Sequence, residues 1–171
     1  MWGIQRIFCA VNEPCGTDAV SRFCRRAVPF VDSFEGLSGP SAQDAIGVTP
    51  DGQPLYPMGK GHFATPVEHV RGVLTEFPKT AVHQGWIPQV FSGLPEKMWS
   101  FVHIDVDLYE PTLACLEYFV PRLQPGGVIV NDDYASPLFP GGGKAWEDYS
   151  ERHKFSFVAL DTGQAVLIKS R

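Results

Sequence analysis

The sequence predicts a doubly wound α/β domain with a mostly parallel sheet, and three observations support this. Two apolar, partly β-branched runs, residues 101–107 and 127–133, are typical of buried strands and turn acidic at their ends. Residues 111–123 between them place apolar side chains at helical spacing, so strand, helix and strand form a crossover with a parallel pair. Residues 155–160 and 165–169 form two further strands, and the four residues joining them favour an antiparallel C-terminal hairpin.

The remaining elements continue this alternation of strands and helices. Residues 28–32 and 80–83 are predicted strands, and residues 66–77 form a predicted helix with its valines and Leu74 on one face. Residues 38–61 are rich in glycine and proline and show no sustained period, which is typical of a lid or a substrate loop. Residues 137–143 are expected to form a second, shorter loop beside an acidic strand end.

Length and composition indicate one globular domain over residues 1–171, with 44% hydrophobic and 19% charged residues. The net charge of -5 disfavours nucleic acid as a partner. Neither a membrane span nor a signal peptide is evident, so we expect a cytoplasmic protein without membrane association. Four cysteines are too few for a disulfide scaffold. Composition does not fix the oligomeric state and leaves a homo-oligomer open.

Paired aspartates end the two best strands, Asp105 and Asp107 on one and Asp132 and Asp133 on the next. Ligands bind at the carboxyl ends of strands in open α/β sheets, and neighbouring strands lie about 4.8 Å apart. Four carboxylates this close repel one another unless a cation or protons neutralise them. Oxygen-only ligation favours Mg²⁺, with Ca²⁺ or Mn²⁺ as alternatives. The other interpretation is that these acids cap helices or face solvent.

Several segments resemble the macrocin O-methyltransferase family, whose members methylate sugar hydroxyls on macrolide and aminocoumarin natural products. Residues 103–112 (HIDVDLYEPT) and 125–134 (PGGVIVNDDY) carry most of the likeness. Three further segments keep the family order, so that the likeness runs over residues 28–169: residues 30–37, 83–88 and 162–165. The resemblance implies a Rossmann-like class I methyltransferase fold, S-adenosylmethionine and Mg²⁺ as cofactors, and a small hydroxylated substrate such as a sugar or another vicinal diol.

The resemblance also implies roles for individual residues. Asp105, Asp132 and Asp133 would bind the metal, and Asp107 would be the general base. Asp32 would hydrogen-bond the cofactor ribose, where this class of fold carries an acid. The residues that the resemblance places around the cofactor are Gly16, Asp32, Ser33, Gly85, Trp86 and Asp105.

The N-terminal region, residues 1–27, departs from the family pattern. A glycine-rich turn is expected after the first strand, yet residues 7–17 contain a single glycine, Gly16. A divergent working loop, a truncated N-terminus and a decayed relative would each account for this. The alternative function is therefore a non-catalytic methyltransferase-like protein that keeps the metal site and binds cofactor poorly.

A second enzyme class remains open from the aspartates alone. Phosphatases of the haloacid dehalogenase type and some glycosyltransferases also use an Asp-x-Asp motif. The phosphatase motif expects threonine or valine where Tyr109 stands, and a glycosyltransferase leaves Asp132 and Asp133 unexplained. Among single residues, His103 is expected to be a core histidine and Lys144 a solvated charge.

Overall fold

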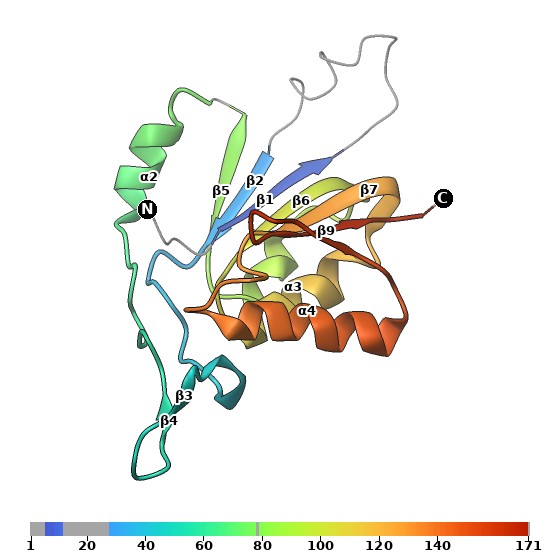
Figure 1. The fold of residues 1–171 in the computed structure, drawn as a ribbon. Helices are drawn as coiled ribbons and strands as arrows, with labels where there is room; N and C mark the ends of the chain where they lie inside the picture. The colour runs from blue at the N-terminus through green and yellow to red at the C-terminus, as the bar shows by residue number, and fades with distance from the viewer. Residues whose placement is uncertain (1–5, 12–27, 78, 171) are drawn as a thin grey trace.

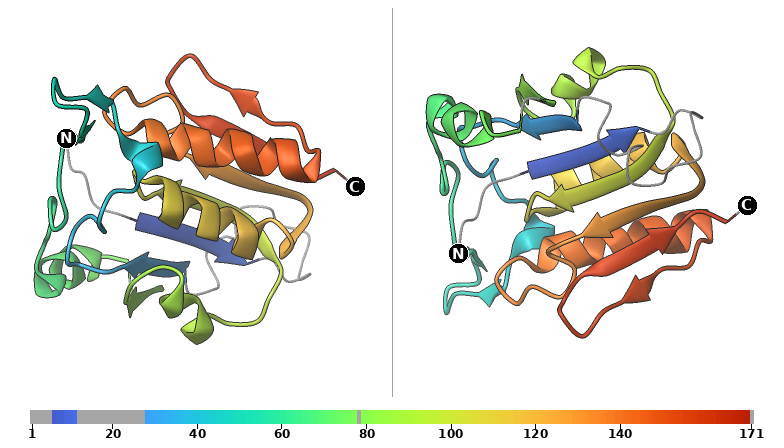
Figure 2. Two further views of the ribbon diagram at one scale, coloured as in Figure 1. Left: turned by 90° about the horizontal axis from the view of Figure 1, so that it is seen from below. Right: turned by 90° about the horizontal axis from the view of Figure 1, so that it is seen from above.

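The computed structural model describes residues 6–11, 28–77 and 79–170, the first of these ranges as backbone only. A seven-stranded sheet in the order β5-β2-β1-β6-β7-β9-β8 forms the centre, and Figure 2 shows α3 and α4 side by side across one face. The elements are β1 (Arg6–Val11), β2 (Val28–Asp32), the 3-10 helix η1 (Ala42–Asp44), β3 (Gly47–Val48), β4 (Pro54–Leu55), α2 (Val67–Leu74), β5 (Thr80–Gln84), the 3-10 helix η2 (Gln89–Gly93), β6 (Trp99–Asp105), α3 (Tyr109–Phe119), β7 (Leu123–Asn131), α4 (Pro140–His153), β8 (Val158–Ala159) and β9 (Ala165–Ile168).

The strand pairing agrees with the predicted architecture except at β1. β2 pairs with β5 and β6 with β7 in parallel, and β8 with β9 forms the predicted antiparallel hairpin. β1 lies between β2 and β6 and is antiparallel to both. Five strands therefore point one way, but only two of the six pairings are parallel, so the expectation of a mostly parallel sheet is met in strand direction and not in pairing.

The main core lies between the sheet and the two helices α3 and α4. α3 contributes Cys115, Leu116 and Phe119, all fully buried, because its apolar residues recur at the helical spacing. Trp99 at the start of β6 and Trp146 on α4 are also fully buried in this cluster. The carboxyl-terminal ends of β6 and β7, which Figure 1 shows beside α3 and α4, are thus carried by a well-packed core.

Helix α4 corrects the prediction of a loop over residues 137–143. The helix begins at Pro140 and includes three successive glycines, which sequence reasoning assigned to the loop. Packing requires glycine at two of these positions. A Cβ at Gly141 would overlap the Asp44 carboxylate, and a Cβ at Gly143 would overlap the Tyr134 carbonyl. The helix therefore forms in spite of the poor helix propensity of glycine, because glycine allows α4 to approach Asp44 and Tyr134 closely.

The long segment over residues 38–61 contains η1 and the small β3–β4 hairpin, which projects from the body of the molecule in Figure 1. Its inner end is fixed by Asp44, whose side chain is buried. Asp44 accepts hydrogen bonds from the Ser41 hydroxyl (2.7 Å) and from the Tyr109 N–H at the start of α3 (2.7 Å). Among the residues the structure describes, no helix has the length and apolarity to cross a bilayer.

Candidate active site

The two predicted acidic strand ends meet at one edge of the sheet. β6 ends at Asp105 and β7 ends at Asn131, and these strands are parallel with Ile104 opposite Asn131. Asp105, Asp107 and Asp133 each offer a carboxylate oxygen, and these oxygens lie within 4.8 Å of one another. The convergence that the strand spacing predicts is therefore observed for three of the four aspartates.

Asp107 adopts a backbone conformation that sequence reasoning did not anticipate. The chain was expected to stay extended through Asp107, but its φ is 60°, in the left-handed region. A tight turn closes around it as the Leu108 N–H donates to the Val106 carbonyl (2.6 Å). Its own N–H donates to Asp133 Oδ2 (2.9 Å), so the Asp133 carboxylate holds this turn in place.

The carboxylate of Asp107 is buried without compensation. The residue is 3% exposed, and its Oδ2 has no hydrogen-bond partner among the described residues. Burial raises the pKa of Asp107 from 3.8 to about 8, and the three neighbouring aspartates add to the rise. Burial also raises the pKa of Asp133 to about 6, partly offset by backbone N–H donors. Such a group of oxygens fits a hard cation, whose charge would offset the repulsion among the carboxylates.

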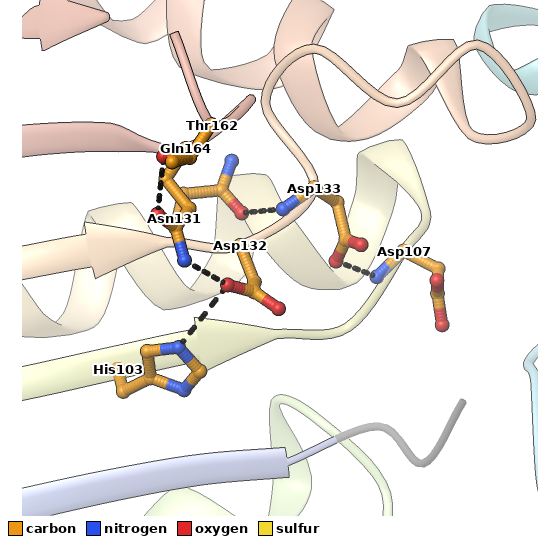
Figure 3. Close-up of polar contacts among 7 residues, drawn as sticks. All are labelled: His103, Asp107, Asn131, Asp132, Asp133, Thr162 and Gln164. Carbon is orange, nitrogen blue, oxygen red and sulfur yellow. Dashed lines mark hydrogen bonds and ion pairs between the residues drawn. The ribbon is translucent and has the colours of Figure 1, made fainter. Parts of the chain in front are cut away.

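Asp132 lies beside this group and makes different contacts (Figure 3). Its Oδ1 accepts a hydrogen bond from Gln164 Nε2 (2.7 Å) and lies 3.5 Å from His103 Nε2. In Figure 3 both contacts fall on one oxygen, and the other points away from His103 and Gln164. Sequence reasoning grouped Asp132 with Asp105 and Asp133; the tightest cluster in the structure contains Asp107 instead.

The residues expected around the cofactor lie at the ends of β2 and β5. Asp32 ends β2, is 3% exposed, and accepts a hydrogen bond from the Phe34 N–H at Oδ1 (2.7 Å). The buried Ser33 hydroxyl accepts from the Glu35 N–H (3.1 Å) and shapes the same turn. Gly85 has a φ of 157° and its N–H donates to the Asp32 carbonyl (3.0 Å), which joins the two strand ends. Asp32, Ser33 and Gly85 thus lie together at this edge of the sheet, their role in cofactor binding stays a prediction, and Gly16 lies outside the described residues.

A cavity of about 420 Å³ opens beside these strand ends. Trp86, half-buried after β5, forms one wall, and the first turns of α3 form another. Ser38 and Gly39, at the start of the long segment after β2, close a third side. The cavity is large enough for part of a small organic molecule.

The C-terminal end of β1 lies at the opposite edge of the sheet from the aspartates. β1 ends at Val11 opposite Trp99, the first residue of β6, while Arg6 lies opposite Asp105. The chain therefore leaves β1 at the far edge of the sheet. The sequence interpretation aligned residues 7–17 with a strand whose end leads into a cofactor loop, and the direction of β1 does not match that alignment.

The sequence matches the family model of the macrocin-O-methyltransferase (TylF) over residues 17–161, well over half of the chain. The chain belongs to this family. Membership confirms the resemblance drawn from residues 103–112 and 125–134.

Two curated relatives of this TylF family chain are O-methyltransferases. The 8-demethyl-8-(2,3-dimethoxy-alpha-L-rhamnosyl)-tetracenomycin-C 4'-O-methyltransferase of Streptomyces olivaceus is 34% identical over 64% of this chain and 42% of its own length. The mycinamicin III 3''-O-methyltransferase of Micromonospora griseorubida is 32% identical over 42% of this chain and 27% of its own length. The TylF family chain thus spans less than half the length of either relative.

Solved structures show the same α/β fold. The O-methyltransferase NovP superposes with a TM-score of 0.67 at 22% identity, covering 86% of this chain and 61% of NovP. CalS11, a calicheamicin methyltransferase, superposes with a TM-score of 0.62 at 22% identity, covering 81% of this chain and 58% of CalS11. The fold of this TylF family member is therefore similar to that of these methyltransferases.

Sequence reasoning assigned no function to several residues that the structure places at the site. His103 was expected in the core, but its side chain is 24% exposed and contacts Asp132. Gln164 lies in a resembling segment without a predicted role, and no pattern predicts a role for Asp44. The contact between Gln164 and Asp132 spans 32 positions of sequence, and that between Asp44 and Tyr109 spans 65, so no local pattern could reveal them. Lys144 is exposed and pairs with Asp148 (3.0 Å), as a solvated charge should.

Proposed function

We propose that this chain is an S-adenosylmethionine- and Mg²⁺-dependent O-methyltransferase that acts on a hydroxyl of a natural-product sugar or another vicinal diol. The observation that carries the proposal is the cluster of Asp105, Asp107 and Asp133, with a buried, unpartnered carboxylate oxygen on Asp107, in a TylF family chain. The names of both curated relatives describe methylation of an oxygen, in one case on a compound carrying a rhamnosyl group.

The proposed cation ligands are Asp105, Asp132 and Asp133, at the ends of β6 and β7. Asp105 and Asp133 belong to the observed carboxylate cluster, Asp132 precedes Asp133 in the chain, and this oxygen-only donor set suits Mg²⁺. When bound, the ion would favour the alkoxide form of an acceptor hydroxyl and so make a weak nucleophile competent at neutral pH. Three aspartate ligands would leave coordination positions open on the ion, because Mg²⁺ is seldom fully enclosed by protein ligands. The two hydroxyls of a vicinal diol could fill these positions.

Asp107 is proposed as the general base that takes the proton from the acceptor hydroxyl. Its carboxylate lies within the same cluster, and Oδ2 has no partner among the described residues, so it is free to accept a proton. The turn around Asp107 fixes the direction of this carboxylate through the bond from its N–H to Asp133. A base held in this way needs no reorganisation when substrate binds.

The proposed methyl donor, S-adenosylmethionine, would bind along the ends of β2 and β5. Asp32 would accept the ribose hydroxyls, with Ser33 shaping its turn, and Gly85 would let the backbone approach closely. Trp86 would provide an apolar wall for the adenine from the 420 Å³ cavity. Asp105 would face both cofactor and cation, and Gly16 is proposed for the methionine end.

A second function is favoured by β1. Because β1 ends at the edge away from Asp105, the described residues include those proposed for the cofactor ribose but no loop after β1 for the methionine end. A methyltransferase-like protein that keeps the cation site and binds the cofactor poorly would have this arrangement. Affinity for S-adenosylmethionine therefore separates the two functions.

The deciding experiment is a calorimetric titration of S-adenosylmethionine into the chain with and without Mg²⁺, alongside the Asp32→Asn variant. The proposal predicts binding that Asp32→Asn weakens at least tenfold, by about 1.4 kcal/mol, and methyl transfer to a rhamnosylated acceptor that EDTA abolishes and Mg²⁺ restores. Heat from Mg²⁺ alone, with none from S-adenosylmethionine at millimolar concentration, would establish the second function. Transfer that persists in EDTA would contradict the role of the cation.

A further inference from the structure

Asp132 is held by a chain of polar contacts that starts in the β8–β9 hairpin. The Thr162 hydroxyl donates to Gln164 Oε1 (2.8 Å), and Gln164 Nε2 donates to Asp132 Oδ1 (2.7 Å). His103 Nε2, on β6, lies 3.5 Å from the same oxygen. Figure 3 shows these contacts converging on Asp132 from two sides of β7. Two elements, the β8–β9 hairpin and β6, thus contact one carboxylate oxygen.

The order of donors and acceptors along this chain has one consistent direction. An ionised carboxylate only accepts, so Gln164 must present its NH₂ group to Asp132 and its carbonyl oxygen to Thr162. The Thr162 hydroxyl supplies the donor that this carbonyl oxygen needs. Thr162 therefore selects the amide orientation in which Gln164 can donate to Asp132.

Both contacts on Asp132 involve Oδ1, so the two carboxylate oxygens have different surroundings. Oδ1 accepts a hydrogen bond from Gln164 and lies against His103, which restricts the rotation of the carboxylate and turns Oδ2 away from both. Asp132 is the most exposed of the four aspartates, with 39% of its side chain accessible, so packing alone does not restrict its rotation. Hydrogen bonds must supply the order that burial gives to Asp107.

We infer that Gln164 is a positioning residue that presents Asp132 Oδ2 to the cation, and that Thr162 acts behind it by fixing the amide of Gln164. This inference rests on the proposed function, since it concerns the same cation site. The outer partners of metal ligands orient them and raise affinity in general. Here the partner comes from the antiparallel hairpin, which gives the β8–β9 turn a role in a site built by β6 and β7.

The hairpin backbone is secured independently of these side chains. The Leu160 N–H donates to the Gln164 carbonyl (2.8 Å), and the Gly163 N–H donates to the Leu160 carbonyl (2.9 Å). The Ala135 N–H, on the loop after β7, donates to the Gly163 carbonyl (2.8 Å). Replacing the side chain of Gln164 or Thr162 therefore removes the contacts to Asp132 without removing the turn.

The test measures Mn²⁺ affinity by electron paramagnetic resonance on the full chain without cofactor or acceptor. Gln164→Met keeps the length of the side chain and removes its donor, and we expect the Kd for Mn²⁺ to rise about tenfold, as for other outer partners of metal ligands. Thr162→Val acts one step further away and should raise the Kd about threefold, in keeping with the loss of one neutral hydrogen bond. Thr162→Ser restores the hydroxyl and should return the Kd to the wild-type value.

Gln53→Met, an exposed glutamine on the β3–β4 hairpin, is the matched control and should leave the Kd unchanged. Mn²⁺ affinity in Gln164→Met equal to that of the wild type, while Asp133→Asn loses binding, would overturn this inference and leave the proposed cation site intact. Equal loss in Gln164→Met and Gln53→Met would also overturn it. Absence of Mn²⁺ binding in the wild type would overturn both the inference and the proposed function.

Discussion

Asp107 combines two costly features at one position. A left-handed backbone is unfavourable for a residue other than glycine, and a buried carboxylate with an unpartnered oxygen is unfavourable in any protein. Both are retained beside Asp105 and Asp133, where a cation and a substrate proton would use them. Strain and uncompensated charge of this kind concentrate at functional sites.

The Asp107→Asn variant tests whether Asp107 accepts the substrate proton or binds the metal. Asparagine has the same shape but cannot accept the proton, so methyl transfer should fall at least about 100-fold, the typical contribution of a general base. Mn²⁺ affinity should stay within threefold of the wild type, because the proposed ligands are Asp105, Asp132 and Asp133. Single-turnover transfer and Mn²⁺ titration measure the two quantities. Loss of Mn²⁺ binding would make Asp107 a ligand instead.

The metal-free chain should become less stable as the pH rises towards 8.5. The folded-state pKa values of Asp107 and Asp133, about 8 and about 6, lie above the ordinary value of 3.8, so the folded state binds these protons more tightly than the unfolded state. The resulting stability is fully present below about pH 3.8 and is lost as the pH rises through the folded pKa values.

Thermal unfolding followed by circular dichroism measures this dependence. Without divalent ions the Tm should be lower at pH 8.5 than at pH 6, by several degrees for each kcal/mol lost. Mg²⁺ should raise the Tm more at pH 8.5, because the cation would then neutralise a carboxylate cluster that has lost its protons. Asp107→Asn should flatten the curve. A metal-free Tm that rises between pH 6 and pH 8.5 would contradict these pKa shifts.

At the scale of elements, the start of α4 joins the two acidic strand ends to the long segment after β2. Gly141 lies against Asp44 and the N–H of Tyr109, and Gly142 lies against Asp107 and Asp133. Any side chain at these positions would displace a group that the site depends on. The three glycines therefore act as a contact surface within a helix.

Gly141→Ala should destabilise the chain by about 1–3 kcal/mol, the usual cost of overpacking. The new Cβ would overlap the Asp44 carboxylate, which bonds to the Tyr109 N–H, and so release η1 from α3. Gly59→Ala is the control, since a Cβ there meets nothing within 4 Å and should change stability by less than about 0.5 kcal/mol. Urea unfolding of both variants gives the comparison. Equal stabilities would show that α4 adjusts to the side chain.

The elements that sequence predicted well are those whose signal is local. The sequence predicts β2 and β6 from apolar runs with acidic ends, and α3 from apolar residues at helical spacing. Each of these signals lies within its own segment. α4 was missed because its three glycines are required by contacts with Asp44 and Tyr134, far away in sequence. The antiparallel pairing of β1 was not predicted either, since strand direction depends on the partners β2 and β6 and not on the composition of β1.

For the whole molecule, the carboxyl edge of β2, β5, β6 and β7 gathers every described residue proposed for cofactor and cation. Sequence reasoning located this edge because parallel strands bring their ends together. It did not resolve how each carboxylate is oriented: the turn at Asp107 and the contact from Gln164 to Asp132 arise only in the folded chain. The division of roles among the four aspartates is therefore the part that most needs measurement.

Anomalous diffraction from crystals soaked in Mn²⁺ tests the central claim most directly. The account predicts one strong peak at the ends of β6 and β7, within about 2.0–2.3 Å of carboxylate oxygens from Asp105, Asp132 and Asp133, with Asp107 close by but not bonded to the ion. A map at saturating Mn²⁺ without a peak between these strand ends would contradict it.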